Sequence, residues 1–350
     1  MSIWIRISDG SALISHSAPA VERAAIRTAL VEARGALLSW DAASDERFPD
    51  AEIHGPVQAL AWLAEIYGVD IAAAVRAAVD ASLPLPQDAE FVDAAHRLAA
   101  LSWARHWWPA GIYTPALNGA VLAAETVLAA HAVEHLLDDE DAVERALHEA
   151  AGAPSALAMV PPRLRADAAS LADALASLAD DHGVVLDPAV ISQPQGWALA
   201  AGARTQPDDG IEISHGTSPV RWADVPAQTV AADSDAQWSL RHVDGVPHLH
   251  ISVAAVPGAT ADLWARFGPE SLDIDVPLHG DGNLFAGHAQ VAASVALLPL
   301  DDRTLWVRDP ILAPVPGPPE AEDDRDAVRE HAVARLDDPQ SSLAERAAAE

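Results

Sequence analysis

The stretch PALNGAVLAAETVLAAHAVEHLL, residues 115–137, decides our interpretation of the fold, because it is the most apolar part of the chain with a helical pattern. Its apolar side chains cover nearly all sides of a helix, which is typical of a central, buried helix. Helical spacing of apolar residues also occurs in residues 26–37, and further helices are predicted over 139–151 and 164–181. The first half of the chain is therefore predicted to be all-α, with its other helices packed around residues 115–137.

A β-rich second half is predicted from about Val184 onward, where Gly and Pro recur at short intervals. Strand-like runs occur at 196–203, 210–214, 236–242, 247–256, 272–276, 283–295 and 303–308. Short strands joined by turns such as Asp244-Gly245 favour an antiparallel sandwich or barrel, of which we choose the sandwich. In the first half, only residues 2–8 alternate as a strand does.

These patterns predict an α+β protein with several domains. An N-terminal all-α helical domain with a short N-terminal strand would span residues 1–183, and an antiparallel β-sandwich-like domain would span residues 184–316. Residues 317–350 are interpreted as an acidic, partly helical and mobile tail that carries little core.

The charge balance limits the possible partners. The formal net charge is -31, every basic residue other than histidine is arginine, and the acidic residues are dispersed along the chain. Such a field repels phosphates, so direct binding to nucleic acid is not expected. Residues 1–6 lack the pattern of a secretory signal and residues 117–137 are interrupted by charged residues, so we expect a cytoplasmic protein without a membrane partner.

The chain contains neither cysteine nor lysine. The missing cysteine excludes disulfides, thiolate zinc sites, iron–sulfur clusters and cysteine nucleophiles. The missing lysine excludes Schiff-base catalysis and the lysine of phosphate-binding loops. Any catalysis by side chains is therefore expected to depend on His, Asp, Glu, Ser or Arg.

One motif has the spacing of a metal site. His131, Glu134 and His135 form a His-x-x-Glu-His sequence, which resembles the motif of the inverted zincin peptidases. That resemblance implies that His131 and His135 bind zinc or iron and that Glu134 is the general base. The alternative is structural, with both histidines continuing the apolar face toward the end of the helix, where the helix dipole favours them.

A tryptophan-rich segment forms the second candidate site. Its members are Trp103, Arg105, His106, Trp107 and Trp108, between two predicted helices. Trp and Arg are the favoured anchors of binding surfaces, which predicts a contact with a ligand or a partner. The same residues are equally suited to sealing a junction between helices.

The function that we favour from the sequence is that of a non-catalytic accessory or adaptor protein in a multi-protein bacterial system, either a peptide-modifying biosynthetic complex or a defence complex. Its partner would be another protein or peptide, possibly basic because the chain is acidic. No cofactor is expected. The alternatives are a metal-dependent hydrolase that uses the His-x-x-Glu-His motif and a helical domain that binds a small molecule.

Overall fold

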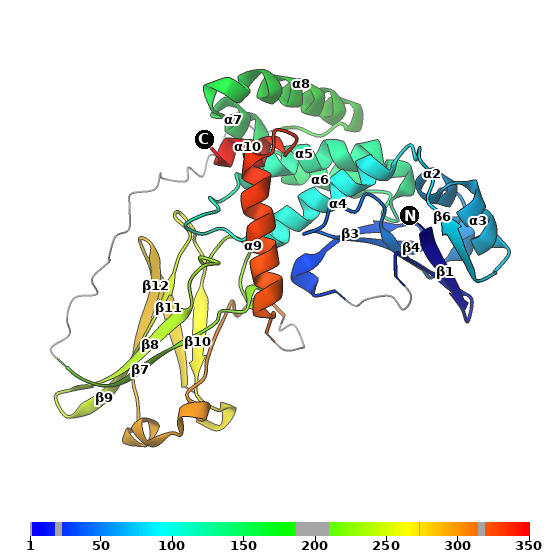
Figure 1. The fold of residues 1–350 in the computed structure, drawn as a ribbon. Coiled ribbons are helices and arrows are strands. Elements are labelled where there is room, and N and C mark those ends of the chain that lie inside the picture. Colours follow the sequence, from blue (N-terminus) through cyan, green and yellow to red (C-terminus); the bar gives the residue numbers. More distant parts are fainter. Residues whose placement is uncertain (1, 18–22, 187–209, 273, 314–318) are drawn as a thin grey trace. The chain divides into compact units, whose positions relative to one another are not determined.

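The computed structural model describes residues 2–17, 23–186, 210–272, 274–313 and 319–350 (Figure 1). The chain divides into two compact units, neither of which is continuous in sequence. Unit 1 comprises Met1–Arg105, Leu117–Ile191 and Glu322–Glu350, and unit 2 comprises His106–Ala116 and Ser192–Ala321.

Unit 1 begins with a six-stranded antiparallel sheet. Its strands are β1 (Ser2–Ser8), β2 (Ser11–Ser15), β3 (Thr28–Ala33), β4 (Ala36–Asp41), β5 (Asp50–Ile53) and β6 (Ala81–Pro84), in the order β3-β4-β5-β2-β1-β6. Alternate side chains are buried along each long strand, as expected for a sheet with one covered face. The predicted strand over residues 2–8 is confirmed as β1.

Helices between residues 56 and 182 lie on one side of this sheet, and the last two, over residues 153–182, lie farther from it and pack on residues 119–132 (Figure 1). The helices are α1 (Pro56–Ala59), α2 (Leu63–Tyr67), α3 (Val69–Arg76), α4 (Val92–Trp107), α5 (Gly119–Ala132), α6 (Ala142–Glu149), α7 (Ala153–Ala158) and α8 (Arg165–His182). The predicted central helix is confirmed as α5, which is buried on most sides and begins where Asn118 Oδ1 accepts backbone N–H groups of Ala120 and Val121. As predicted, α8 ends at Gly183, which adopts a left-handed conformation.

The prediction of an all-α N-terminal domain is wrong, because the chain begins with this sheet. Residues 26–37, predicted to be helical, contain the end of a 3-10 turn, the whole of β3, the turn at residues 34–35 and the first two residues of β4. Ala29, Val31 and Ala33 are buried, while Leu30, between the first two, is 43% exposed. This alternation has the two-residue period of a strand and not the 3.6-residue period of a helix. The left-handed conformation of Gly35 completes the tight turn that joins the two strands.

The described residues of unit 2 form a seven-stranded antiparallel sheet. Its strands are β7 (Ile211–Ser218), β8 (Ala236–Val243), β9 (Val246–Ala254), β10 (Leu263–Phe267), β11 (Ile274–Asp281), β12 (Leu284–Gln290) and β13 (Leu305–Arg308), in the order β13-β10-β11-β12-β9-β8-β7. The sheet curls so that β13, at one edge, contacts β7 and β8 at the other. Trp238, Leu249, Ile251, Phe267 and Phe285 are buried in the core that it encloses.

The predicted two-sheet sandwich is also wrong, because all seven strands belong to one curled sheet. Alternating burial along β8 and β9 indicates one covered face, but it is the same in a sandwich and in a sheet that curls over its own core. Six of the predicted runs correspond to β7, β8, β9, β11, β12 and β13, and β10 was not predicted. The strand predicted over residues 196–203 lies outside the described residues.

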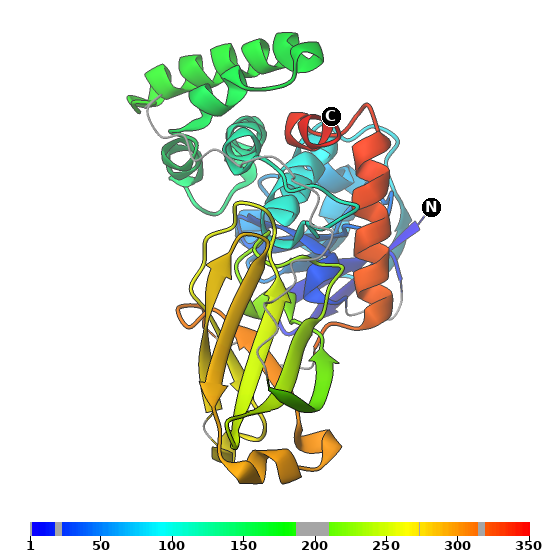
Figure 2. The ribbon, with the colours of Figure 1, turned by 90° about the vertical axis from the view of Figure 1, so that its left-hand side faces the viewer.

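The C-terminal segment belongs to unit 1 and contains α9 (Glu322–Asp337) and α10 (Leu343–Ala348). It carries more core than expected, because Val328, Ala332, Leu343 and Ala344 are all buried. Figures 1 and 2 show α10 beside the helices of residues 92–132, in agreement with its contacts to α5. The short α10 is capped by Ser342 and Glu345 in a reciprocal capping box.

None of the helices in the described part of the chain combines the length and the apolar run that crossing a bilayer requires.

Two partly buried histidines lie near the contact between α9 and α4. His331 of α9 contacts the ring of Trp103 edge-on, and His96 of α4 stacks on Trp40. Burial lowers the pKa of both imidazoles, and the charge of the nearby Arg335 lowers both pKa values further. Nearby carboxylates oppose this shift without reversing it: Asp93 at His96, and Glu345, Asp45 and Asp41 at His331. The folded state therefore favours neutral imidazoles at both positions.

This packing predicts that unit 1 loses stability as the pH falls. A histidine with a lowered folded pKa contributes its full stability above its unfolded pKa of about 6.5 and loses it as the pH falls below that value. We expect urea unfolding, followed by the helical signal at 222 nm, to show lower stability at pH 5.5 than at pH 7.5. The difference should shrink in H96Q/H331Q and persist in a variant of the exposed His148, H148Q; an unchanged difference in the double variant would contradict the assignment.

Candidate functional site

The His-x-x-Glu-His motif does not lie on one continuous helix. Helix α5 ends at Ala132, so the helix predicted to reach residue 137 stops between the two histidines, and residues 134–136 form a single 3-10 turn. His131 Nδ1 lies 3.2 Å from Glu134 Oε2, whereas His135 Nε2 lies 2.6 Å from Glu65 Oε2 on α2. Within the described residues, no three His, Asp or Glu side chains are placed to hold a metal ion.

The tryptophan-rich segment is divided between the two units. Trp103 belongs to the core of unit 1, where it is 4% exposed and its Nε1 donates to the carbonyl oxygen of Ile26 at 2.7 Å. Arg105 forms an ion pair with Glu149 of α6. For these two residues, the structure therefore supports the role of a seal between helices.

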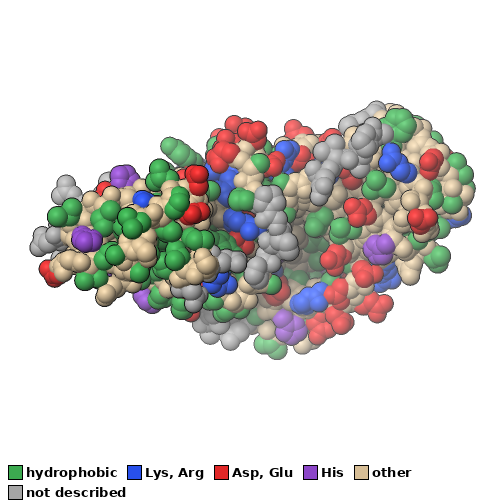
Figure 3. All heavy atoms as spheres, turned by 90° about the horizontal axis from the view of Figure 1, so that it is seen from below, with side chains coloured by type: hydrophobic (Ala, Val, Ile, Leu, Met, Phe, Trp, Pro, Cys, Tyr) green, Lys and Arg blue, Asp and Glu red, His purple; other side chains and the backbone are tan. Residues whose placement is uncertain are grey.

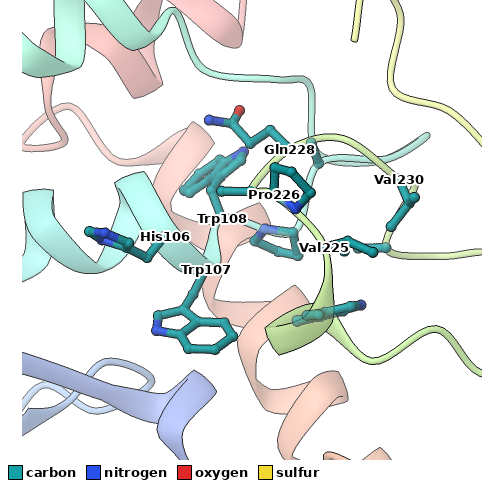
Figure 4. Close-up of a pocket in the computed structure, with 12 residues that line it drawn as sticks. His106, Trp107, Trp108, Val225, Pro226, Gln228 and Val230 are labelled. Atoms are coloured by element: carbon teal, nitrogen blue, oxygen red, sulfur yellow. The ribbon is translucent and has the colours of Figure 1, made fainter. Parts of the chain in front are cut away.

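His106, Trp107 and Trp108 lie in unit 2, where they line a small hollow together with residues of the segment 222–232. Figure 4 shows the rings of Trp107 and Trp108 pointing away from one another, with Gln228 on the side of Trp108. Gln228 has a φ of 55°, a backbone conformation that non-glycine residues seldom adopt and that is often found at functional sites. The hollow has a volume of about 20 Å³, which is room for about one water molecule and too little for a substrate.

The loop of residues 109–115, which follows Trp108, is held in one conformation by hydrogen bonds and exposes two apolar side chains. Trp108 Nε1 donates to the Pro115 carbonyl oxygen at 2.9 Å, and the Ile112 backbone N–H donates to Asp233 Oδ2 at 2.7 Å. The Thr114 hydroxyl donates to the Pro109 carbonyl oxygen, and the Gly111 N–H donates to the Thr114 carbonyl oxygen at 2.8 Å. On this loop, which we call the braced loop because of these hydrogen bonds, Ile112 is 70% exposed and Tyr113 is 77% exposed.

A further polar cluster, which the sequence did not indicate, lies at the end of the unit 1 sheet. Asp50 accepts hydrogen bonds from the His16 backbone N–H at 2.9 Å, from His16 Nδ1 at 3.1 Å and from Arg23 Nη2 at 2.6 Å. Burial would raise the pKa of the Asp50 carboxyl, but the His16 hydrogen bonds and the Arg23 charge outweigh it, so the pKa lies below its usual value. Asp50 is therefore an ionised acceptor, and His16 Nδ1 carries the proton that it binds.

His16 lines a groove beside this cluster with a volume of about 560 Å³, within the range of ligand-binding pockets. The groove is also lined by Ser44, Asp45, Glu46, Arg47, Phe48, Leu85 and Pro86. The sequence signal was weak, because His16 and Asp50 are 34 residues apart. Only the pairing of β2 with β5 brings the residue after one strand next to the first residue of the other.

No protein-family model, no curated protein and no solved structure matches this chain.

Proposed function

We propose that this protein is a non-catalytic accessory or adaptor protein that recognises another protein or peptide within a multi-protein bacterial system. The observation that supports this function most directly is the braced loop of unit 2 with its exposed Ile112 and Tyr113. A loop already held in one conformation loses little entropy on binding, so its apolar side chains contribute more of their burial energy to affinity. Tyr and Trp are also enriched among the residues that dominate binding energy.

A second apolar surface on unit 2 favours the same function. Leu297 and Leu300, on two short 3-10 turns over residues 293–302, are 84% and 79% exposed. Figure 3 shows hydrophobic side chains gathered on the surface of unit 2. The same turns also carry two exposed acidic residues, Asp301 and Asp302. Contiguous exposed apolar surface on a folded protein is typical of a site of interaction with another macromolecule.

The charge of the chain indicates the nature of the partner. A net charge of -31 attracts a basic partner and accelerates its association, while the apolar surfaces supply affinity. The hollow at Trp107 and Trp108 is too small for a substrate, and the described residues offer no three-ligand metal site. Recognition by a surface is therefore favoured over catalysis at the His-x-x-Glu-His motif and over binding of a small molecule in the hollow at Trp107 and Trp108.

The test is affinity capture from native lysate of the source cells with I112S/Y113S beside the wild-type protein. We expect the wild type to retain a specific partner, identified by mass spectrometry, and the variant to lose at least nine-tenths of it, since anchor residues each contribute about 2 kcal/mol or more. V57S/V69S is the matched control, because these valines of unit 1 are as exposed as the loop residues. Equal capture by the loop variant and the control would refute this function.

A further inference from the structure

The groove beside His16 has an oriented hydrogen-bond acceptor in its wall. Only 8% of the His16 side chain is exposed, and its Nδ1 is bound to Asp50. No described residue hydrogen-bonds the other ring nitrogen, Nε2, and the groove is lined by this side chain. In the neutral tautomer whose Nδ1–H donates to Asp50, Nε2 presents a lone pair that accepts a hydrogen bond from a group in the groove.

The charges around the groove leave it with an excess of negative charge. Arg47 is neutralised by Asp93, whose carboxylate oxygens lie 2.7 and 2.8 Å from Nε and Nη2 of its guanidinium. Asp50 is likewise balanced by Arg23 at 2.6 Å. Asp45 and Glu46 also line the groove, and Glu46 Oε2 lies 3.8 Å from His16 Nδ1.

The groove also has an apolar part. Leu85 and Pro86 line it on one side, and Phe48 contributes a ring over which the Arg47 guanidinium lies, at 5.4 Å from the ring centroid. An apolar wall next to an acidic rim suits a side chain that has an aliphatic stem and a charged, hydrogen-bond-donating end.

We propose that this groove binds a basic side chain of a partner peptide, with its cationic end donating to His16 Nε2 and to the carboxylates of Asp45 and Glu46. A guanidinium can donate along two edges at once, so arginine fits this arrangement of acceptors best. The inference deepens the proposed function and rests on it, because it assigns the chemistry of the partner. It uses a surface of unit 1 and not the loop of unit 2.

The test measures binding of defined peptides to the full-length protein by fluorescence anisotropy. The probe is fluorescein-labelled Ala-Ala-Arg-Ala-Ala-amide, compared with the same peptide carrying citrulline, which has the shape of arginine without its charge. We expect the arginine peptide to bind at least tenfold more tightly than the citrulline peptide, and its affinity to fall as salt is added. Equal binding of the two peptides, or no binding of the arginine peptide at 1 mM protein, on the order of the weakest affinities of interest, would overturn the proposal.

Variants separate this site from general attraction to an acidic protein. D45N/E46Q should bind the arginine peptide about tenfold more weakly, since it removes two carboxylates from the rim. D180N/D181N removes the same charge from the exposed end of α8 and should bind within twofold of the wild type. H16F, which removes the Nε2 acceptor, should also bind more weakly, and an unchanged melting temperature would show that it folds.

The outcomes are distinguishable from those for the proposed function. If D45N/E46Q and D180N/D181N lose affinity equally, the groove is not the site, while capture of a partner through Ile112 and Tyr113 is unaffected. If I112S/Y113S retains its partner but the groove variants lose the arginine peptide, the proposed function fails and the peptide site stands as a separate observation.

Discussion

Replacing Trp103 by alanine should lower the free energy of unfolding of unit 1 by about 3–5 kcal/mol, the usual cost of deleting a large buried aromatic side chain. Trp103 is 4% exposed, its Nε1 donates to Ile26, and its ring contacts His331. W103A therefore leaves a cavity and also removes the donor that satisfies the Ile26 carbonyl oxygen, in the 3-10 turn before β3. Urea unfolding followed by circular dichroism at 222 nm measures the loss, since the helices of the described chain lie almost wholly in unit 1.

Trp107, four residues later, provides the matched control. It is only partly buried and lines the hollow of unit 2, so W107A should change the same transition by less than about 1 kcal/mol. Similar losses for W103A and W107A would contradict the division of this segment between the two units.

Replacing Glu125 by alanine should destabilise unit 1 by about 3–4 kcal/mol and detach α10. The buried Glu125 carboxylate accepts the backbone N–H groups of Leu343 at 2.7 Å and Ala344 at 3.0 Å. Without it, two buried donors at the start of α10 have no acceptor, and each unsatisfied group costs about 1–3 kcal/mol. Hydrogen–deuterium exchange should show faster exchange at these two amides, together with the lower unfolding free energy.

The control for this variant is E144A, in which an exposed glutamate of α6 is removed and a change within about 0.5 kcal/mol is expected. E125Q should lie between the wild type and E125A, because it retains one oxygen acceptor but places an amide donor beside the other N–H. Unchanged exchange at Leu343 and Ala344 in E125A would show that α10 is held by other contacts.

The sequence predicted the helices of unit 1 better than its strands. Helix α5 is apolar on nearly all sides and α8 is followed by glycine, so both had local signals. Four of the six residues of β3, Ala29, Leu30, Val31 and Ala33, are apolar. The apolar pattern of this segment is therefore compatible with both a helix and a strand. The segment forms a strand because tertiary packing covers one face of the sheet and buries alternate side chains of β3.

The candidate sites were predicted less well than the fold elements. The prediction for the tryptophan-rich segment placed five residues in one site, whereas they contribute to two separate units. The metal prediction assumed that a helix continues past Ala132, but the helix ends there and the two histidines form ion pairs with different partners. The cluster of His16, Arg23 and Asp50 forms through strand pairing, which a single sequence does not reveal.

The return of the C-terminal segment to unit 1 has a consequence for synthesis on the ribosome. Residues 1–191 emerge long before α9 and α10, which supply Val328, Ala332 and the backbone donors bound by Glu125. At about 5–20 residues per second, translation delivers those helices at least several seconds after α5. Unit 1 therefore completes its core only after the whole of unit 2 has been made, and nascent chains expose the apolar surface that α9 and α10 later cover.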